Sequence, residues 1–287
     1  MLYRNLFIFL FFFAKVHSYQ SCTETKNEVH LSSKQYDLNK PAILKLNDAL
    51  VEISGIYFYP KDSSIFAISD ESGYLFKIYL NRKLITQRWK FSKAHDYEDV
   101  VLQDGVFYIL ESNGNIHTLN FSKNGDTIYR RKSIFPYNKQ NEFESLYYDD
   151  GYKKLVMICK DCKADKKGAT KAWSFDPETE IYTPDLFTIT LNTVVKKLGK
   201  PKIKFKPSAA TINPLTNDVW IISSINQLIV VTDREGNFKD VYTLDPIIFK
   251  QPEGIAFTPW GDLIISNEAG DKYGTGNLLI FKLKKNS

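Results

Sequence analysis

Cysteine, histidine and methionine are scarce in this chain, whose 287 residues include three Cys, four His and two Met. Cys159 and Cys162 form a single C-x-x-C pair without a second pair, so a structural zinc site is not expected. His95 and His117 stand apart from any nucleophile at a familiar spacing, so the sequence offers no Ser-His-Asp set. These absences argue against the commonest zinc and serine-hydrolase patterns.

The chain also lacks a strong charge of one sign and a second long apolar run. Lys and Arg number 38 against 33 Asp and Glu, and no basic stripe is interleaved with aromatic residues. We therefore expect no nucleic-acid partner. Beyond the N-terminus, no apolar stretch is long enough to form a transmembrane helix.

The long apolar run that is present covers residues 6–14 and follows the positive charge of Arg4. At about nine residues, this run is too short to cross a membrane as a helix. The order of charge, apolar run and small polar residues predicts a signal peptide over residues 1–21, with a buried first strand as the alternative. A polar tether over residues 22–34 would follow the signal peptide.

Two processing sites compete at the end of the signal peptide. Residues 16–18, Val-His-Ser, suit ordinary cleavage, whereas Ser21-Cys22 suits a lipoprotein in which Cys22 is lipidated. In an oxidising compartment Cys159 and Cys162 could close a disulfide, which would leave Cys22 unpaired and favour lipidation. We expect an exported protein of the cell envelope, either a membrane-anchored lipoprotein or a periplasmic or extracellular protein.

Beyond the tether, the sequence contains five repeats, which is the strongest pattern in the chain. They open at residues 52–55 (EISG), 98–101 (EDVV), 144–147 (ESLY), 208–211 (SAAT) and 253–256 (EGIA). Successive openings lie about 46, 46, 64 and 45 residues apart, and such spacings suit one four-stranded propeller blade each. The aromatic content of 14% also favours strands.

Within each repeat, strands alternate with turns rich in Asp, Asn and Gly, such as Asp104-Gly105. The second strand is an unbroken apolar run, for example residues 155–158 (LVMI), as expected of strands covered on both faces. The sequence therefore predicts an all-β protein, a β-propeller of five blades. The wide third spacing contains residues 185–205, where we expect a short helix over residues 191–198 or, alternatively, a degenerate sixth blade.

The fifth repeat stops after the strand expected over residues 278–283, so its blade lacks a fourth strand. A strand-like segment around residues 36–46 precedes the first repeat and has no blade of its own. Because an open sheet edge invites pairing with other chains, we expect the N-terminal strand to complete the last blade and close the ring. The propeller domain would then span residues 35–287.

Equivalent positions in a propeller converge on its axis, so four of the five openings should bring a glutamate to one mouth of the channel. Converging carboxylates repel one another unless they bind a cation, hold a proton or meet a basic partner. Calcium prefers oxygen ligands of this kind. The candidate metal ligands are Glu52, Glu98, Glu144, Glu253 and Asn267. Further channel-lining candidates are Asp70, Asn113, Lys160, Ser208 and Ser224. The alternative interpretation is that the glutamates cap turns by accepting hydrogen bonds from backbone amides.

Several motifs resemble those of the SdiA-regulated (YjiK-like) family: residues 52–55 (EISG), 96–100 (DYEDV), 251–257 (QPEGIAF) and 261–268 (GDLIISNE). The similarity covers about residues 45–283, and it implies an envelope-associated bacterial propeller that often carries a signal or lipoprotein sequence. More distantly, the repeats are similar to calcium-dependent lactonase and phytase-like propellers. That likeness implies calcium ligands at Glu52, Glu98, Glu144, Glu253 and Asn267.

Three functions stay open at this point. The first is a calcium-capable binding propeller of the envelope, whose ligand is a small molecule or an envelope protein and whose N-terminal lipid would associate with the membrane. The second is a metal-dependent esterase, lactonase or phosphatase that uses the same ring of carboxylates. Such catalysis needs an open metal position and a general base. The third is an interaction scaffold, which needs neither.

Overall fold

The computed structural model describes residues 32–80, 84–122, 128–137, 140–163, 165, 168–200, 203, 205–270 and 274–284. The expected signal peptide, the expected lipidation site at Cys22 and most of the expected tether lie outside these residues. Within the described part of the chain, no helix has the length and apolar character that crossing a membrane requires.

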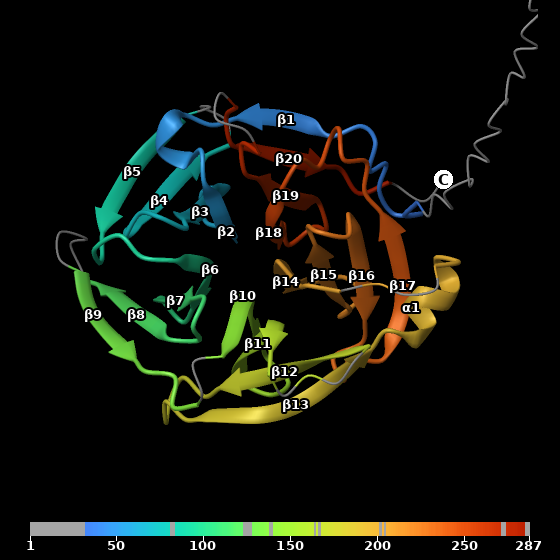
Figure 1. Cartoon of the computed structure of the whole chain (residues 1–287). Helices are drawn as coiled ribbons and strands as arrows, with labels where there is room; N and C mark the ends of the chain where they lie inside the picture. The colour runs from blue at the N-terminus through green and yellow to red at the C-terminus, as the bar shows by residue number, and fades with distance from the viewer. Residues whose placement is uncertain are drawn as a thin grey trace, which may run out of the picture.

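The described strands form five antiparallel sheets of four strands each, arranged as blades around a central axis (Figure 1). Each of the first three blades is named here from its innermost strand outward. Blade 1 contains β2 (Ile53–Tyr59), β3 (Ser64–Ser69), β4 (Tyr74–Tyr79) and β5 (Leu84–Lys90). Blade 2 contains β6 (Tyr97–Gln103), β7 (Val106–Glu111), β8 (Ile116–Phe121) and β9 (Ile128–Ser133). Blade 3 contains β10 (Asn141–Asp149), β11 (Lys154–Cys162), β12 (Ala169–Phe175) and β13 (Tyr182–Thr190).

The remaining two blades follow the same plan. Blade 4 contains β14 (Ala209–Ile212), β15 (Val219–Ser223), β16 (Leu228–Thr232) and β17 (Phe238–Thr243). Blade 5 contains β18 (Pro252–Phe257), β19 (Leu263–Asn267), β20 (Asn277–Phe281) and β1 (Ala42–Lys45). The five-bladed prediction is confirmed, and the wide third spacing holds the long strand β13 and the short helix α1 (Asn192–Lys197) in place of a sixth blade.

The N-terminal strand closes the ring, as the sequence predicts. Strand β1 pairs antiparallel with β20, with Ala42 opposite Ile280 and Lys45 opposite Asn277. Just before β1, the hydroxyl of Tyr36 donates a hydrogen bond of 2.7 Å to the backbone carbonyl of Gly261. The short 3₁₀ helix η1 (Asp48–Leu50) then leads into blade 1. The first and last segments of the described chain therefore share one sheet.

The hydrophobic core lies between blades. Five clusters of buried apolar side chains each combine residues of two neighbouring blades, including the pair formed by blades 5 and 1. Between blades 1 and 2, for example, the rings of Phe66 and Phe107 meet edge to face with centroids 4.6 Å apart. This packing explains the unbroken apolar runs, because both faces of a second strand are covered.

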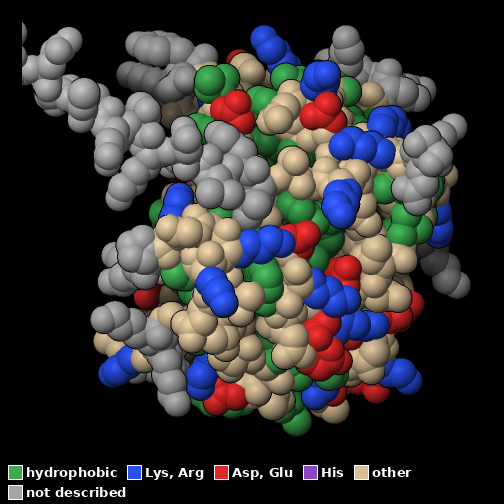
Figure 2. All heavy atoms as spheres, turned by 90° about the vertical axis from the view of Figure 1, so that its right-hand side faces the viewer, with side chains coloured by type: hydrophobic (Ala, Val, Ile, Leu, Met, Phe, Trp, Pro, Cys, Tyr) green, Lys and Arg blue, Asp and Glu red, His purple; other side chains and the backbone are tan. Residues whose placement is uncertain are grey.

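The outer surface carries charges of both signs. On the side formed by β17 and α1, basic and acidic side chains are interspersed (Figure 2). Lys197 of α1 forms an ion pair with Asp240 of β17, and Lys239 of β17 pairs with Asp218. Exposed pairs of this kind contribute little to stability.

Candidate functional site

Hydrogen bonds between neighbouring blades fix the innermost strands around the axis. The Ser54 hydroxyl donates to the backbone carbonyl of Glu98 at 2.6 Å, which joins blades 1 and 2. The Ser208 hydroxyl donates to the carbonyl of Pro252 at 2.9 Å, which joins blades 4 and 5. These contacts place the beginnings of the innermost strands around one mouth of the channel.

A cavity of about 180 Å³, here named the acidic cavity, lies at that mouth. The charged side chains that line it are Glu52, Asp70, Asp96, Glu98, Glu142, Glu144, Glu253, Glu268 and Lys160. The structure thus brings together all four glutamates of the repeat openings. Their place in the cavity lining favours the channel interpretation over turn capping.

Three of the opening glutamates are aimed into the cavity by β-bulges. In the pairing of β6 with β7, Tyr97 lies opposite Glu111 and Asp99 lies opposite Leu110, which leaves Glu98 as an extra residue. Similar register shifts leave Glu144 and Glu253 as extra residues in β10 and β18. A bulge bends the strand locally and redirects the side chain of the extra residue.

Three carboxylates form the tightest group within the acidic cavity. Glu52 precedes β2, Asp70 follows β3 and Glu268 follows β19, and one carboxylate oxygen from each lies within 4.8 Å of the other two. Asp70 Oδ1 is buried and has no hydrogen-bond partner among the described residues. Burial and the nearby charges of Glu52, Glu71 and Asp96 raise the pKa of Asp70 to about 6.

Two further carboxyls of the cavity share this electrostatic environment. Burial and the charge of Asp96 raise the pKa of Glu98 to about 9, against the opposing effect of Lys160. Burial also raises the pKa of Glu253 to about 7, although Lys160 and hydrogen bonds from Gln251 and Ser224 lower it. Burial is the largest cause of both raised pKa values, and the charge of Lys160 opposes it in both cases.

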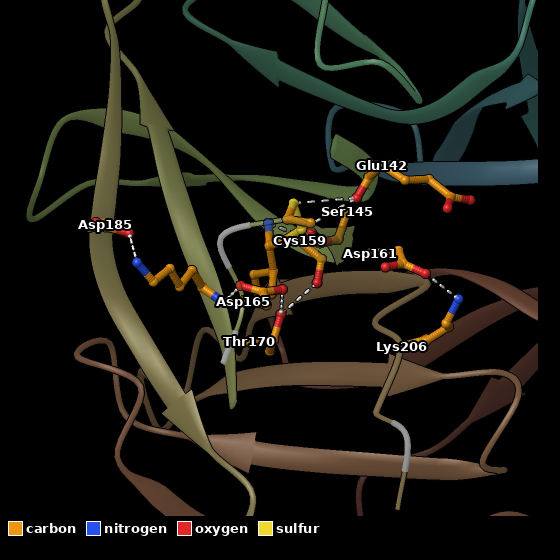
Figure 3. Close-up of a disulfide and its surroundings, with 11 residues drawn as sticks. Glu142, Ser145, Cys159, Asp161, Asp165, Thr170, Asp185 and Lys206 are labelled. Carbon is orange, nitrogen blue, oxygen red and sulfur yellow. Dashed lines mark hydrogen bonds and ion pairs between the residues drawn. A yellow bond between two sulfur atoms is a disulfide. The ribbon is translucent and has the colours of Figure 1, made fainter. Parts of the chain in front are cut away.

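Lys160 is the basic side chain of the acidic cavity. Its ammonium lies 2.8 Å from Glu142 Oε1 and also forms an ion pair with Glu144. Lys160 lies in β11 between the two cysteines, which form a disulfide with a Cα–Cα distance of 5.9 Å (Figure 3). The structure therefore contains the disulfide between Cys159 and Cys162 that the sequence analysis considered possible.

Two asparagines from the sequence prediction lie elsewhere. Asn267 is fully buried, and its amide nitrogen donates to the backbone carbonyl of Ile248 at 2.8 Å. Among the described residues, the cavity is lined by the next residue, Glu268, and Asn267 does not contribute to the lining. Asn113 stabilises the turn after β7, where its Oδ1 accepts a hydrogen bond of 3.0 Å from the amide of Asn115. Neither asparagine is among the described residues that line the acidic cavity, although Asn267 Oδ1 is buried without a hydrogen-bond partner among the described residues.

Ser208 and Ser224 line a second cavity of about 450 Å³ that adjoins the first. The two cavities share Glu144, Lys160, Gln251 and Glu253. The second cavity is thus a continuation of the acidic cavity toward blade 4, and its wall is more basic because Lys206 and Lys250 also line it.

The opposite mouth of the channel has a different character. A cavity of about 330 Å³ is lined there mainly by apolar side chains, including Val100, Ala210 and Ala256. Asp99 also lines this cavity and accepts a hydrogen bond of 2.7 Å from the amide of Leu146. Complete burial raises the pKa of Asp99 well above its ordinary value, although bonds from the amides of Leu146 and Val100 oppose this effect.

Sequence reasoning missed Asp96, Glu142 and Glu268. A signal for the first two was available, because each is an acidic residue that stands two positions before an opening glutamate, Asp96 just before β6 and Glu142 within β10. Glu268 directly follows the predicted Asn267 at the end of β19, and of the two residues Glu268 lines the acidic cavity.

No family model matches the chain, and no curated protein matches it. Among solved structures, the glutaminyl cyclase of Myxococcus xanthus has a TM-score of 0.57 at 14% identity, over 86% of this chain and 96% of that one. A luciferin-regenerating enzyme has a TM-score of 0.52 at 14% identity, over 86% and 98%. The PQQ-bound aldose sugar dehydrogenase of Streptomyces coelicolor has a TM-score of 0.51 at 9% identity, over 85% and 99%. At these identities the likeness shows the β-propeller fold alone.

Proposed function

We propose that this β-propeller binds a divalent cation, of which calcium is the best match, in the acidic cavity of its axial channel. The observation that carries the proposal is the group formed by Glu52, Asp70 and Glu268. Their oxygens converge within 4.8 Å, and Asp70 Oδ1 is buried without a hydrogen-bond partner among the described residues. A bound cation would supply the missing partner for this oxygen.

The donor atoms favour calcium over other metals. The three converging side chains offer carboxylate oxygens, and calcium accepts six to eight oxygen ligands in flexible geometry. Zinc prefers nitrogen and sulfur ligands, and magnesium usually keeps several of its waters. Because burial and mutual repulsion raise the pKa of Asp70 to about 6, a cation that neutralises the cavity would stabilise the folded protein.

Calorimetric titration with calcium chloride, combined with thermal unfolding, tests this function. We expect binding and a rise in melting temperature with calcium that a chelator reverses. At a calcium concentration about 100 times Kd, the stabilisation would be about 2.7 kcal/mol. Glu52→Gln combined with Glu268→Gln should abolish both effects. Glu71→Gln, which removes one negative charge from an exposed neighbour of Asp70, is the matched control and should retain them. The absence of any binding of calcium or magnesium at millimolar concentration would end the proposal.

A metal-dependent hydrolase is the second candidate function, and Glu253 is the residue that favours it. Its pKa of about 7 suits a general base or acid at neutral pH, and it lines both the acidic cavity and the adjoining cavity. A hydrolase should lose most of its turnover of a lactone or phosphate ester in Glu253→Gln and keep its affinity for calcium. If the propeller only binds its ligand, neither the wild type nor Glu253→Gln should turn over a lactone or phosphate ester.

The cell envelope is the proposed location, which rests on the N-terminal sequence alone. The apolar run and Ser21-Cys22 support export and lipidation. The likeness to the SdiA-regulated family supports the same location through the quoted motifs. In that setting the propeller would present its cation site to a small molecule or to another envelope protein.

A further inference from the structure

Lys160 occupies the acidic cavity as a cation supplied by the chain itself. Among the described residues that line the cavity, it is the one basic side chain beside eight carboxylates. Its ammonium contacts Glu142 and Glu144, and its charge lowers the pKa of both Glu98 and Glu253. A divalent cation that entered the cavity would meet the repulsion of this ammonium.

The position of Lys160 depends on a β-bulge in β11. Glu142 lies opposite Asp161 and Phe143 lies opposite Cys159, so Lys160 is left without a partner in the ladder. An extra residue of this kind is redirected away from the regular alternation of the strand. Here the redirected side chain enters the cavity instead of following the alternation of its neighbours.

The disulfide encloses this bulge. Cys159 and Cys162 flank the segment Lys160-Asp161, and their bond joins the backbone on both sides of it. Asp161 holds Lys206 through an ion pair of 2.8 Å, and Thr170 donates to the carbonyl of Cys159 at 2.6 Å (Figure 3). The bond therefore restricts the backbone that carries Lys160 and keeps its ammonium among the carboxylates.

We propose that Lys160 is a built-in competitor of the divalent cation and that the disulfide between Cys159 and Cys162 keeps it in place. Reduction of the disulfide would free the bulge, release Lys160 from Glu142 and Glu144, and strengthen cation binding. The inference rests on the proposed cation site. The group of Glu52, Asp70 and Glu268 belongs to blades 1 and 5, so reduction in blade 3 would leave it intact.

The reduction step requires a dithiol reductant. One thiolate of the reductant attacks a disulfide sulfur, the S–S bond breaks, and the second thiol of the reductant resolves the mixed disulfide. Two electrons and two protons pass to Cys159 and Cys162, which become thiols, and the reductant becomes a disulfide. Cys159 is fully buried and Cys162 is 7% exposed, so Cys162 is the sulfur that the reductant would reach.

Calcium titrations of the full chain test the competition. Reduction with dithiothreitol should tighten calcium binding by about tenfold, which corresponds to about 1.4 kcal/mol. The double variant Cys159→Ser with Cys162→Ser should bind equally tightly without reductant. Lys160→Met should bind tightly in both redox states, whereas Lys160→Arg should behave as the wild type. Lys239→Met, which removes an exposed positive charge from β17, is the matched control. Equal tightening by reduction in wild type and Lys160→Met would overturn the role of Lys160.

A measurement without calcium separates this inference from the proposed function. Acetylation of Lys160 by an N-hydroxysuccinimide ester, followed by peptide mass spectrometry, should be several times faster after reduction, while Lys239 should react at an unchanged rate. Reduction could speed up the acetylation of Lys160 without changing the affinity for calcium. That result would overturn the proposal that Lys160 competes with the cation, but it would not contradict the proposed cation site. An acetylation rate of Lys160 that is the same before and after reduction would overturn the proposal that the disulfide keeps Lys160 in place. The absence of calcium binding in every form would overturn both proposals.

Discussion

The hydroxyl of Ser266 donates a hydrogen bond of 2.8 Å to the backbone carbonyl of Ser54 and so joins the last blade to the first. The two residues are 212 positions apart in the sequence, and both are buried. Gly254 lies beside this contact in the innermost strand β18. The junction that closes the ring therefore depends on the close approach of three backbone segments next to the acidic cavity.

Gly254→Ala should destabilise the propeller at this junction. An added Cβ would lie 2.6 Å from the carbonyl oxygen of Ser54 and would also press on the Ser266 hydroxyl. Because backbone on both sides is fixed by packing, we expect a loss of about 3 kcal/mol in the free energy of unfolding. Gly105→Ala is the control, since its Cβ would meet no atom within 4 Å and only its φ of +80° would cost about 1 kcal/mol. Equal losses in denaturant titrations of the two variants would contradict the close approach.

Deletion of residues 35–47 should open the ring. The deletion removes Tyr36 and strand β1, which leaves the backbone of β20 unpaired along one edge. An exposed edge strand promotes pairing with other chains, so we expect aggregation or a large loss of thermal stability. Ile43→Ala is the control, because this side chain of β1 is 60% exposed. A monomeric deletion variant that melts like the wild type would contradict the closing role of the N-terminal strand.

The architecture could be predicted because each blade repeats the same local chemistry. The apolar second strands and the Asp- and Gly-rich turns recur with each repeat, and the missing fourth strand of blade 5 points to the segment that completes it. Residues 36–46 were expected to pair, and Ala42–Lys45 do so. The five repeats each predict the same four-stranded blade, so the architecture rests on several agreeing segments of the sequence and not on one.

The site was harder to predict because bulges interrupt the alternation of faces. Glu98, Glu144 and Glu253 are extra residues in their ladders, so counting by twos along the strand does not place their neighbours. Asn267 and Glu268 are consecutive residues at the end of β19, and Asn267 is fully buried whereas Glu268 lines the cavity. A bulge inserts an extra residue into one strand of a pair, and the repeat pattern in the sequence does not show where that residue lies.

Cys22→Ala tests the N-terminal predictions. We expect the wild type to be exported without its first 21 residues and to associate with the membrane through a lipid on Cys22. Fractionation of cells that express the Cys22→Ala variant should find the protein released from the membrane. The variant Cys159→Ser with Cys162→Ser keeps Cys22 and should stay membrane-associated. Full-length protein in the cytoplasm would contradict export, and unchanged membrane association of Cys22→Ala would contradict lipidation alone.

The carboxylate of Glu111 should control the acid stability of blade 2. Glu111 is 1% exposed, and its oxygens lie 2.6 Å from His117 Nε2, 2.6 Å and 2.8 Å from Lys132 Nζ, and 2.7 Å from Asn115 Nδ2. Burial alone would raise the pKa of Glu111, but the hydrogen bonds from His117, Lys132 and Asn115 outweigh it and hold the pKa well below its ordinary value. The carboxylate is therefore favoured in the folded state.

A lowered pKa in the folded state fixes the sign of the pH dependence. The contribution of Glu111 is fully present above the pKa of the unfolded chain, about 4.3, and is lost as the pH falls toward the lower folded value. Glu111→Gln should therefore melt at a lower temperature at pH 7, with a loss of about 3 kcal/mol because a buried charge pair is broken. The difference from the wild type should shrink as the pH falls below about 4. Glu178→Gln removes an exposed carboxylate and serves as the control. A gap between wild type and Glu111→Gln that stays constant from neutral to acid pH would show that Glu111 is not held ionised by its partners.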